Sequence, residues 1–123
     1  MKIETNELID AALDFAVALA RDESVRVEGG RVRFALSQFT NDYDLYSPST
    51  DWAQGGPIIE RERIELRPSR FGATGWTAWT LDQATKTQPR NVGKSASSPL
   101  IAAMRCFVSS KLGDEVDVPE ELL

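Results

Sequence analysis

Two segments, one near each end of the chain, have apolar residues at helical spacing. In residues 6–21 the apolar stripe consists of Leu8, Ile9, Ala12, Leu13, Phe15, Ala16 and Leu19. In the C-terminal segment it consists of Leu100, Ile101, Met104, Phe107, Val108 and Leu112. A stripe of this period is typical of a helix that packs one face against a sheet. The second helix has Ser97 or Ser98 as its N-cap, Pro99 in its first turn and Gly113 at its end.

Residues 25–36 alternate between apolar and polar side chains, and a Gly-Gly pair interrupts the alternation. The two glycines supply the positive φ angles that a two-residue hairpin turn requires. Such a turn places Val27 opposite Val32 and Glu28 opposite Arg31, which pairs two apolar side chains and two opposite charges. Because register and turn agree, the segment is predicted to be a β-hairpin.

Two further strands are expected later in the chain. Ile64 and Leu66 alternate with charged residues within residues 58–67, and residues 75–81 are aromatic and β-branched. The alternation in the second strand does not decide which of its faces meets the core. The polar, turn-rich residues 37–57, which precede these strands, are expected to form a loop.

These elements predict an α+β fold. It has a small antiparallel sheet of about four strands, made of the hairpin and the two further strands, packed by the N-terminal and C-terminal helices. With 123 residues, 41% of them hydrophobic and 27% charged, the chain has the size and composition of one globular domain. We therefore expect a single domain over residues 1–123, in which residues 82–97 form a mobile loop and residues 114–123 an acidic, extended tail.

Net charge and cysteine content narrow the partners and the compartment. The net charge of −5 opposes non-specific binding of nucleic acid, which depends on Lys and Arg neutralising phosphates. No apolar run approaches the roughly 20 residues that span a bilayer, and no secretory leader precedes the first helix. Cys106 is the single cysteine, so no disulfide can form within the chain. We therefore expect a cytoplasmic protein that binds neither nucleic acid nor membrane.

The chain contains no histidine, which removes the commonest general base and metal ligand. Cys106 lies in the apolar C-terminal helix and is expected to be a buried, inert thiol. Glu60 and Glu62 would share one face of a strand, but no second feature supports a hydrolase that uses two carboxylates. We expect no catalytic residue, no metal and no cofactor, and interpret the chain as a binding protein rather than an enzyme.

The most distinctive polar segment runs from Tyr46 to Pro57. It mixes aromatic rings, hydroxyls, an amide and a glycine pair, and Arg61 follows shortly after it. Aromatic rings stack on flat ligands, and arginine pairs with phosphate or carboxylate. Small-molecule sites are built from such groups. The same residues also suit a loop whose aromatic side chains attach it to the core, so both interpretations stay open.

Two long motifs carry a family resemblance. They are YSPSTDWAQGGPIIER, from Tyr46 to Arg61, and PLIAAMRCFVSSKLGDEVDVPEEL, from Pro99 to Leu122. Together with the N-terminal pattern that begins at Glu7, they resemble the NinX-like family of small tailed-phage and prophage proteins. The resemblance implies an accessory protein, encoded near replication and recombination genes, that acts in the cytoplasm of an infected bacterium. It implies no particular molecular function, but it marks residues 51–57 as the family's signature.

The signature directs the candidate ligand site to this segment and its flanks. Asp51 and Gln54 would hydrogen-bond a ligand, Trp52 would stack on it, and Arg61 would neutralise its charge. The complete set of predicted ligand-binding residues is Tyr46, Asp51, Trp52, Gln54, Gly55, Gly56, Glu60 and Arg61.

Two functions fit these observations best. The first is binding of a nucleotide-like small molecule, by which a phage protein would sequester a signal of host immunity. A homo-oligomer is compatible with this function, with Met104 and Phe107 on a dimer face. The second is an adaptor or inhibitor that docks on a host protein through its acidic surface and tail. An enzyme that uses Asp51, Glu60 or Glu62 is the third and least supported hypothesis.

Overall fold

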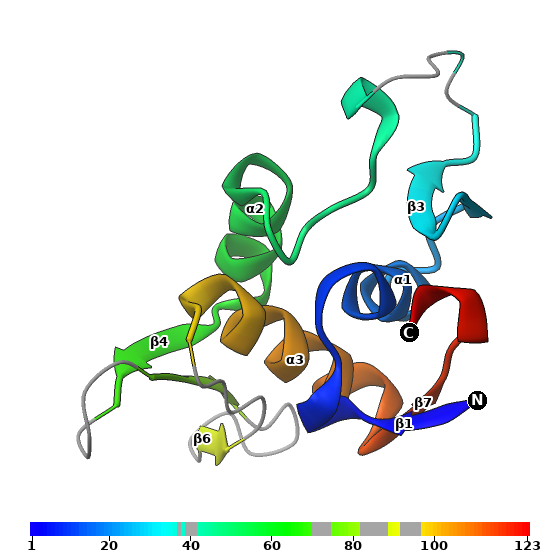
Figure 1. The fold of residues 1–123 in the computed structure, drawn as a ribbon. Coiled ribbons are helices and arrows are strands. Elements are labelled where there is room, and N and C mark those ends of the chain that lie inside the picture. The colour runs from blue at the N-terminus through cyan, green and yellow to red at the C-terminus, as the bar shows by residue number, and fades with distance from the viewer. Residues whose placement is uncertain (37, 39–41, 70–74, 82–88, 92–96) are drawn as a thin grey trace.

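The computed structural model describes residues 1–36, 38, 42–69, 75–81, 89–91 and 97–123 (Figure 1). Within these residues the chain has three α-helices and seven short strands. The helices are α1 (Asp10–Ala20), α2 (Trp52–Glu62) and α3 (Pro99–Leu112). The strands are β1 (Lys2–Glu4), β2 (Val25–Glu28), β3 (Arg31–Phe34), β4 (Glu65–Pro68), β5 (Trp76–Leu81), β6 (Pro89–Asn91) and β7 (Glu115–Asp117). Short 3-10 helices cover Thr5–Glu7, Asp42–Asp44 and Glu120–Leu122.

Helix α3 forms the centre of the structure. Strands β4 and β5, helices α1 and α2, and strand β7 all contact it, and Figure 1 shows it between α1 and the β4 side of the molecule. Ser98 caps the helix by accepting a hydrogen bond from the amide of Ile101, and Gly113 ends it with a φ of 88°. These boundaries confirm the prediction. The expected dimer face is wrong, because Met104 and Phe107 are buried within the core.

The hairpin of β2 and β3 has the predicted register, with Val27 opposite Val32 and Glu28 opposite Arg31. Its two turn glycines have φ angles of 63° and 72°. In the described residues, however, the strands do not join into a single sheet. They form the pairs β1–β7 and β2–β3 and the three-stranded sheet β4–β5–β6, all antiparallel. The α+β class is therefore confirmed, while the expected single sheet is wrong because the hairpin packs on α1 instead of pairing with β4.

Helix α2 occupies the segment where a loop followed by a strand was expected. Asp51 caps its N-terminus, and Arg63 ends it in the left-handed conformation, with φ 54° and ψ 47°. Ile58, on its inner side, is buried in the core. Packing of this side against α3 overrides the weak helix propensity of the Gly-Gly-Pro sequence. The predicted strand over residues 58–67 is therefore wrong in its first part, and β4 begins only at Glu65.

The start of helix α1 and the C-terminal segment also differ from the sequence prediction. Helix α1 begins at Asp10, since residues 5–7 form a 3-10 turn and Leu8 is buried in an extended conformation. The C-terminal segment is not a free acidic tail. Its strand β7 pairs with β1, and its apolar side chains Val116, Val118 and Leu122 are buried in the core. The segment is therefore held to the fold by these three side chains and by its pairing with β1.

Strand β5 matches its prediction, and its face with Ala78 and Thr80 is the buried one. Most of the expected loop at residues 82–97, namely 82–88 and 92–96, lies outside the described residues, while residues 89–91 form β6. None of the helices described is both long and apolar enough to cross a membrane.

Candidate functional site

The polar side chains of the signature form hydrogen bonds that fix the start of α2 and the segment before it. One carboxylate oxygen of Asp51 accepts a hydrogen bond from the amide of Ala53 at 2.9 Å. The side-chain amide of Gln54 donates to the carbonyl oxygen of Leu45 at 2.9 Å and accepts from the amide of Ser47 at 2.9 Å. Asp51 is thus a helix cap, and Gln54 fixes the preceding segment to the helix. Neither side chain is directed to a ligand in this arrangement.

Gly55 permits a close approach of backbone and helix. A Cβ atom at this position would lie 2.4 Å from the carbonyl oxygen of Pro48 and 2.5 Å from Cδ1 of Leu100. Contacts of this length are not tolerated, so only glycine fits between the preceding segment and α3. A Cβ atom on Gly56 would meet nothing within 4 Å. The structure therefore gives a packing reason for Gly55 and none for Gly56.

The remaining predicted residues do not come together around one ligand position. Trp52 is 54% exposed at the start of α2, and Glu60 and Arg61 are exposed near its other end. Arg61 lies 3.6 Å from a carboxylate oxygen of Glu62. The two glutamates at 60 and 62 lie on a helix, where residues two apart do not face each other, so the expected shared strand face is wrong.

Tyr46 lies apart from α2, in the core beside the hairpin. Its ring meets Phe34 edge to face, with centroids 5.2 Å apart and an interplanar angle of 86°. Its hydroxyl oxygen accepts a long hydrogen bond of 3.5 Å from Arg21. Burial raises the pKa of the Tyr46 hydroxyl. Tyr46 is the single predicted site residue that also lines a cleft in the described structure.

This cleft lies between α1, β3 and the segment before α2, and its volume is about 190 Å³. It contains two carboxyls, a guanidinium and several hydroxyls. Its polar lining comes from Asp10, Asp14, Arg31, Tyr46, Ser47 and Thr50. Apolar contributions come from Ala11, Val32 and Leu45. A concave site with apolar walls and a few convergent polar groups is the usual form of a small-ligand site.

Asp14 is the unusual group of the cleft. It is only 5% exposed, and the amide of Ser49 donates to one of its oxygens at 2.8 Å. Within the described residues no Lys or Arg forms an ion pair with it. Burial raises the pKa of Asp14 from 3.8 to about 6, and the contacts with Ser49 offset part of this effect. Strongly perturbed carboxyls in clefts are typical of functional sites.

Sequence reasoning missed Asp14 because it lies inside an amphipathic helix, where a polar residue is normally assigned to the solvent face. A usable signal was present. Asp10 and Asp14 are four residues apart, and the second interrupts the run AALDFAVALA, in which all other residues are apolar. A helix that is apolar on nearly all sides packs into the core, so a charged residue within such a run is a candidate for burial.

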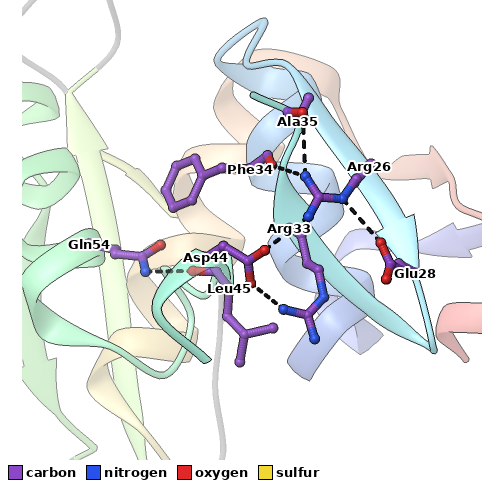
Figure 2. Close-up of polar contacts among 8 residues, drawn as sticks. All are labelled: Arg26, Glu28, Arg33, Phe34, Ala35, Asp44, Leu45 and Gln54. Carbon is purple, nitrogen blue, oxygen red and sulfur yellow. Dashed lines mark hydrogen bonds and ion pairs between the residues drawn. The ribbon is translucent and has the colours of Figure 1, made fainter. Parts of the chain in front are cut away.

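A second buried carboxylate, Asp44, is surrounded by arginines (Figure 2). Its side chain is 0% exposed. Arg26 donates to one of its oxygens at 2.9 Å, and Arg33 donates to the other. Arg26 also donates to the carbonyl oxygens of Phe34 and Ala35, at 2.6 and 3.3 Å. This network fixes the start of the segment before α2 to the hairpin, just as Gln54 fixes its middle to α2.

The described residues contain no group of three or more His, Cys, Asp or Glu side chains that could hold a metal ion. Cys106 is fully buried in α3, and burial raises the pKa of its thiol to about 12. The expected buried thiol is therefore confirmed, and at neutral pH it is not a nucleophile.

Comparison with known proteins gives the family. No match to this chain is found among curated proteins. The family model described as Bacteriophage P22, NinX matches residues 4–111. The matched region includes helices α1 and α2, all of α3 except its last residue, and the cleft beside Asp14. The resemblance seen in the sequence motifs is thus confirmed, and the chain belongs to the phage P22 NinX family.

Proposed function

We propose that this NinX-family protein acts by binding a nucleotide-like small molecule in the cleft beside Asp14. The observation that carries the proposal is a nearly inaccessible carboxyl that lines a cleft without an ionic partner in the described structure. Such a group lowers the stability of the folded protein unless a ligand with hydrogen-bond donors satisfies it. The hydrogen bonds from Ser49 offset only part of the cost of burying this carboxyl.

The size of the cleft limits what enters it. Sites for whole drug-sized ligands have volumes of about 300–1,000 Å³, whereas this cleft has about 190 Å³. The cleft therefore takes one ring of a ligand, and the rest of the molecule stays outside. Arg31, an exposed residue of the cleft, is suited to a phosphate of that outer part.

The wall of the cleft is held in place before any ligand arrives. The segment that carries Tyr46, Ser47 and Thr50 is fixed by Asp44 at its start, by Gln54 in its middle and by Asp51 at its end. A preorganised wall reduces the entropy lost on binding. The signature residues that do not touch the cleft thus support binding indirectly.

Membership of a phage family indicates the setting in which the proposed binding would act. A small protein that holds a nucleotide-type molecule without consuming it would sequester a signal of host immunity in an infected cell. The cleft side chains offer hydrogen bonds and charge, and we propose binding without turnover. Catalytic consumption of a bound nucleotide would contradict this part of the proposal.

The first test is thermal unfolding of the full chain with a panel of nucleotides, cyclic nucleotides and ADP-ribose derivatives. A ligand at about 100 times its dissociation constant adds about 2.7 kcal/mol to the free energy of unfolding. For a chain of this size the midpoint rises by several degrees. We expect at least one member of the panel to produce this rise.

Two variants locate the binding. Thr50→Tyr places a ring at the mouth of the cleft, because Thr50 is exposed and lines it. Trp52→Ala is the matched control, because Trp52 is exposed nearby in sequence but does not line the cleft. We expect the rise to be lost in Thr50→Tyr and kept in Trp52→Ala. The reverse result would place the ligand on α2, and a panel without any rise would refute small-molecule binding.

A second candidate function is docking on a host protein, and one observation favours it. Exposed carboxylates gather where β1 and β7 pair, and a cavity of about 320 Å³ there is lined by Glu4, Asp114 and Glu115 with Thr5, Asn6 and Ser109. Such a surface is complementary to a basic patch on a partner. Deleting residues 114–123 is not a suitable test, because it removes Val116 and Val118 from the core.

Charge reversal tests this alternative without truncation. We would compare capture of host proteins by the native chain with capture by the double variant Asp114→Lys, Glu115→Lys. Glu60→Lys, on the exposed side of α2, is the control for a general effect of charge. Loss of a stoichiometric partner in the double variant alone would support docking, and equal capture by all three proteins would contradict it.

A further inference from the structure

We infer that the group bound beside Asp14 is a flat fork of N–H donors, as found on the edge of a guanine base or on a guanidinium. This inference rests on the proposed binding function and names the chemical class of its ligand. Asp10 and Asp14 lie one turn apart on α1, and Arg31 is the one cation in the described lining. The described lining therefore has two carboxyl groups and one cation, which favours a ligand group that donates hydrogen bonds.

The hydrogen bonds around Asp14 leave it with acceptor capacity. An ionised carboxylate has about four lone-pair sites. In the described structure Ser49 is the residue that contacts the Asp14 carboxyl, through its amide at 2.8 Å and with its side chain as a second contact. The carboxyl therefore has room for two further hydrogen bonds. A phosphate at this position would be repelled by both Asp14 and Asp10.

The walls of the cleft favour a flat donor group over a compact one. Val32, Leu45 and Tyr46 line it with mostly apolar surface. An ammonium group is compact and strongly hydrated, so moving it between such walls is costly. A guanidinium or guanine edge is planar, is more weakly hydrated or neutral, and places two parallel N–H groups on one carboxylate. This geometry fits the cleft and its volume of about 190 Å³.

The same fork of N–H donors occurs on a guanine base and on an arginine side chain. The two ligands differ in the part that stays outside the cleft. A guanine nucleotide brings phosphates that reach the exposed Arg31, whereas an arginine derivative brings no anion to it. Calorimetric titration of the full chain with GMP, IMP, AMP and N-acetyl-arginine amide separates these sources. IMP is the sharpest comparison, because it differs from GMP only in lacking the 2-amino donor.

We expect GMP to bind and IMP to bind more weakly by about tenfold to a hundredfold, the usual effect of losing a hydrogen bond to a charged group. If the source is an arginine side chain, N-acetyl-arginine amide binds and GMP does not. Both results support the donor fork. Equal affinity for GMP and IMP would overturn it, because the amino group would then make no contact.

Asp14→Asn provides a gain of binding that loss of folding cannot imitate. An asparagine amide donates one hydrogen bond and accepts one, so it matches the 2-oxo edge of xanthine and mismatches the 2-amino edge of guanine. We expect the variant to lose GMP and gain XMP. GMP binding that survives unchanged in Asp14→Asn would overturn the inference.

Failure of the inference is distinguishable from failure of the proposed function. If AMP or a pyrimidine nucleotide binds and Thr50→Tyr abolishes that binding, the cleft is a nucleotide site but the donor fork is wrong. If N-acetyl-arginine amide binds and no nucleotide does, the donor fork stands but the nucleotide-like ligand of the proposed function is wrong. If no nucleotide and no arginine derivative binds, both the inference and the proposed function are wrong.

Discussion

Asp44 and Asp14 are both buried carboxylates, but their surroundings differ. Asp44 lies between Arg26 and Arg33, which hydrogen-bond its two oxygens from neighbouring strands. Asp14 has the amide and side chain of Ser49 and no described cation. The first charge is compensated within the fold, and the second is not. Asp44 thus holds the structure together, whereas the Asp14 charge is the one that the proposed ligand would satisfy.

The pKa of Asp14 gives the cost of the uncompensated charge. A carboxyl whose pKa rises from 3.8 to about 6 on folding binds its proton more tightly in the folded state. Stability is therefore lost as the pH rises through this window, and the loss is complete above pH 6. Its size is about 3 kcal/mol, and it disappears below pH 3.8.

The largest effect is expected from Asp44→Asn, which removes the charge between Arg26 and Arg33. Breaking a buried ion pair by removing one partner costs about 3–5 kcal/mol, because the opposite charge is left uncompensated. We expect the midpoint of thermal unfolding to fall by more than about 10 °C. A fall of only one or two degrees would show that the arginines reach water once Asp44 is neutral.

Asp14→Asn is expected to act in the opposite direction. The asparagine oxygen still accepts from the amide of Ser49, while the cost of burying a charge is removed. At pH 7.5 the free energy of unfolding should rise by up to about 3 kcal/mol, and at pH 3.5 the variant and the native chain should be equally stable. Denaturant unfolding at both pH values measures this. A variant less stable than the native chain at pH 7.5 would place Asp14 in the same structural class as Asp44.

A smaller effect is expected at Gly55, which lies against Pro48 of the segment before α2 and Leu100 of α3. Gly55→Ala forces a Cβ atom against Pro48 and Leu100 and should cost about 1–3 kcal/mol. Gly56→Ala is the matched control, since its Cβ meets nothing, and it should raise stability by about 0.5–1 kcal/mol. Thermal unfolding compares the two. Equal effects would mean that the close approach at Gly55 contributes nothing.

The smallest effect is expected from Glu28→Gln. Glu28 pairs with the same Arg26 as Asp44 does, at 3.1 Å, but its side chain is 64% exposed. Exposed pairs contribute about 0–1 kcal/mol, so the midpoint should move by no more than a few degrees. An effect as large as that of Asp44→Asn would show that burial is not what distinguishes the two carboxylates.

The sequence predicted correctly those parts of the fold in which several local features favour the same structure. In the hairpin the turn glycines, the apolar pairs and the charge pair all favour one register. Helix α3 has its cap, its apolar stripe and its terminal glycine in the correct places. Helix α2 was missed because Gly55, Gly56 and Pro57 are helix breakers in isolation. The reason for Gly55 lies in Leu100, which is 45 residues away in the chain and adjacent only in the fold.

The candidate site was predicted less well for a related reason. The predicted site residues lie within residues 46–61, but Asp51, Gln54 and Gly55 make contacts with the chain itself and do not line the cleft. Asp14 comes from a different element. Its place in an apolar run was a usable signal, but its hydrogen bond with Ser49 joins residues 35 apart in the chain, and no local pattern reveals that contact. Only Tyr46 connects the predicted residues with the cleft.

The burial of Cys106 has a practical consequence for spectroscopy. A thiol that is 0% exposed and whose pKa is about 12 does not react with maleimide or iodoacetamide dyes under native conditions. A cysteine introduced in place of the exposed Thr50 would then be the one position that takes a fluorophore. The label would stand at the mouth of the cleft, and its emission would report occupancy without a second substitution to remove Cys106.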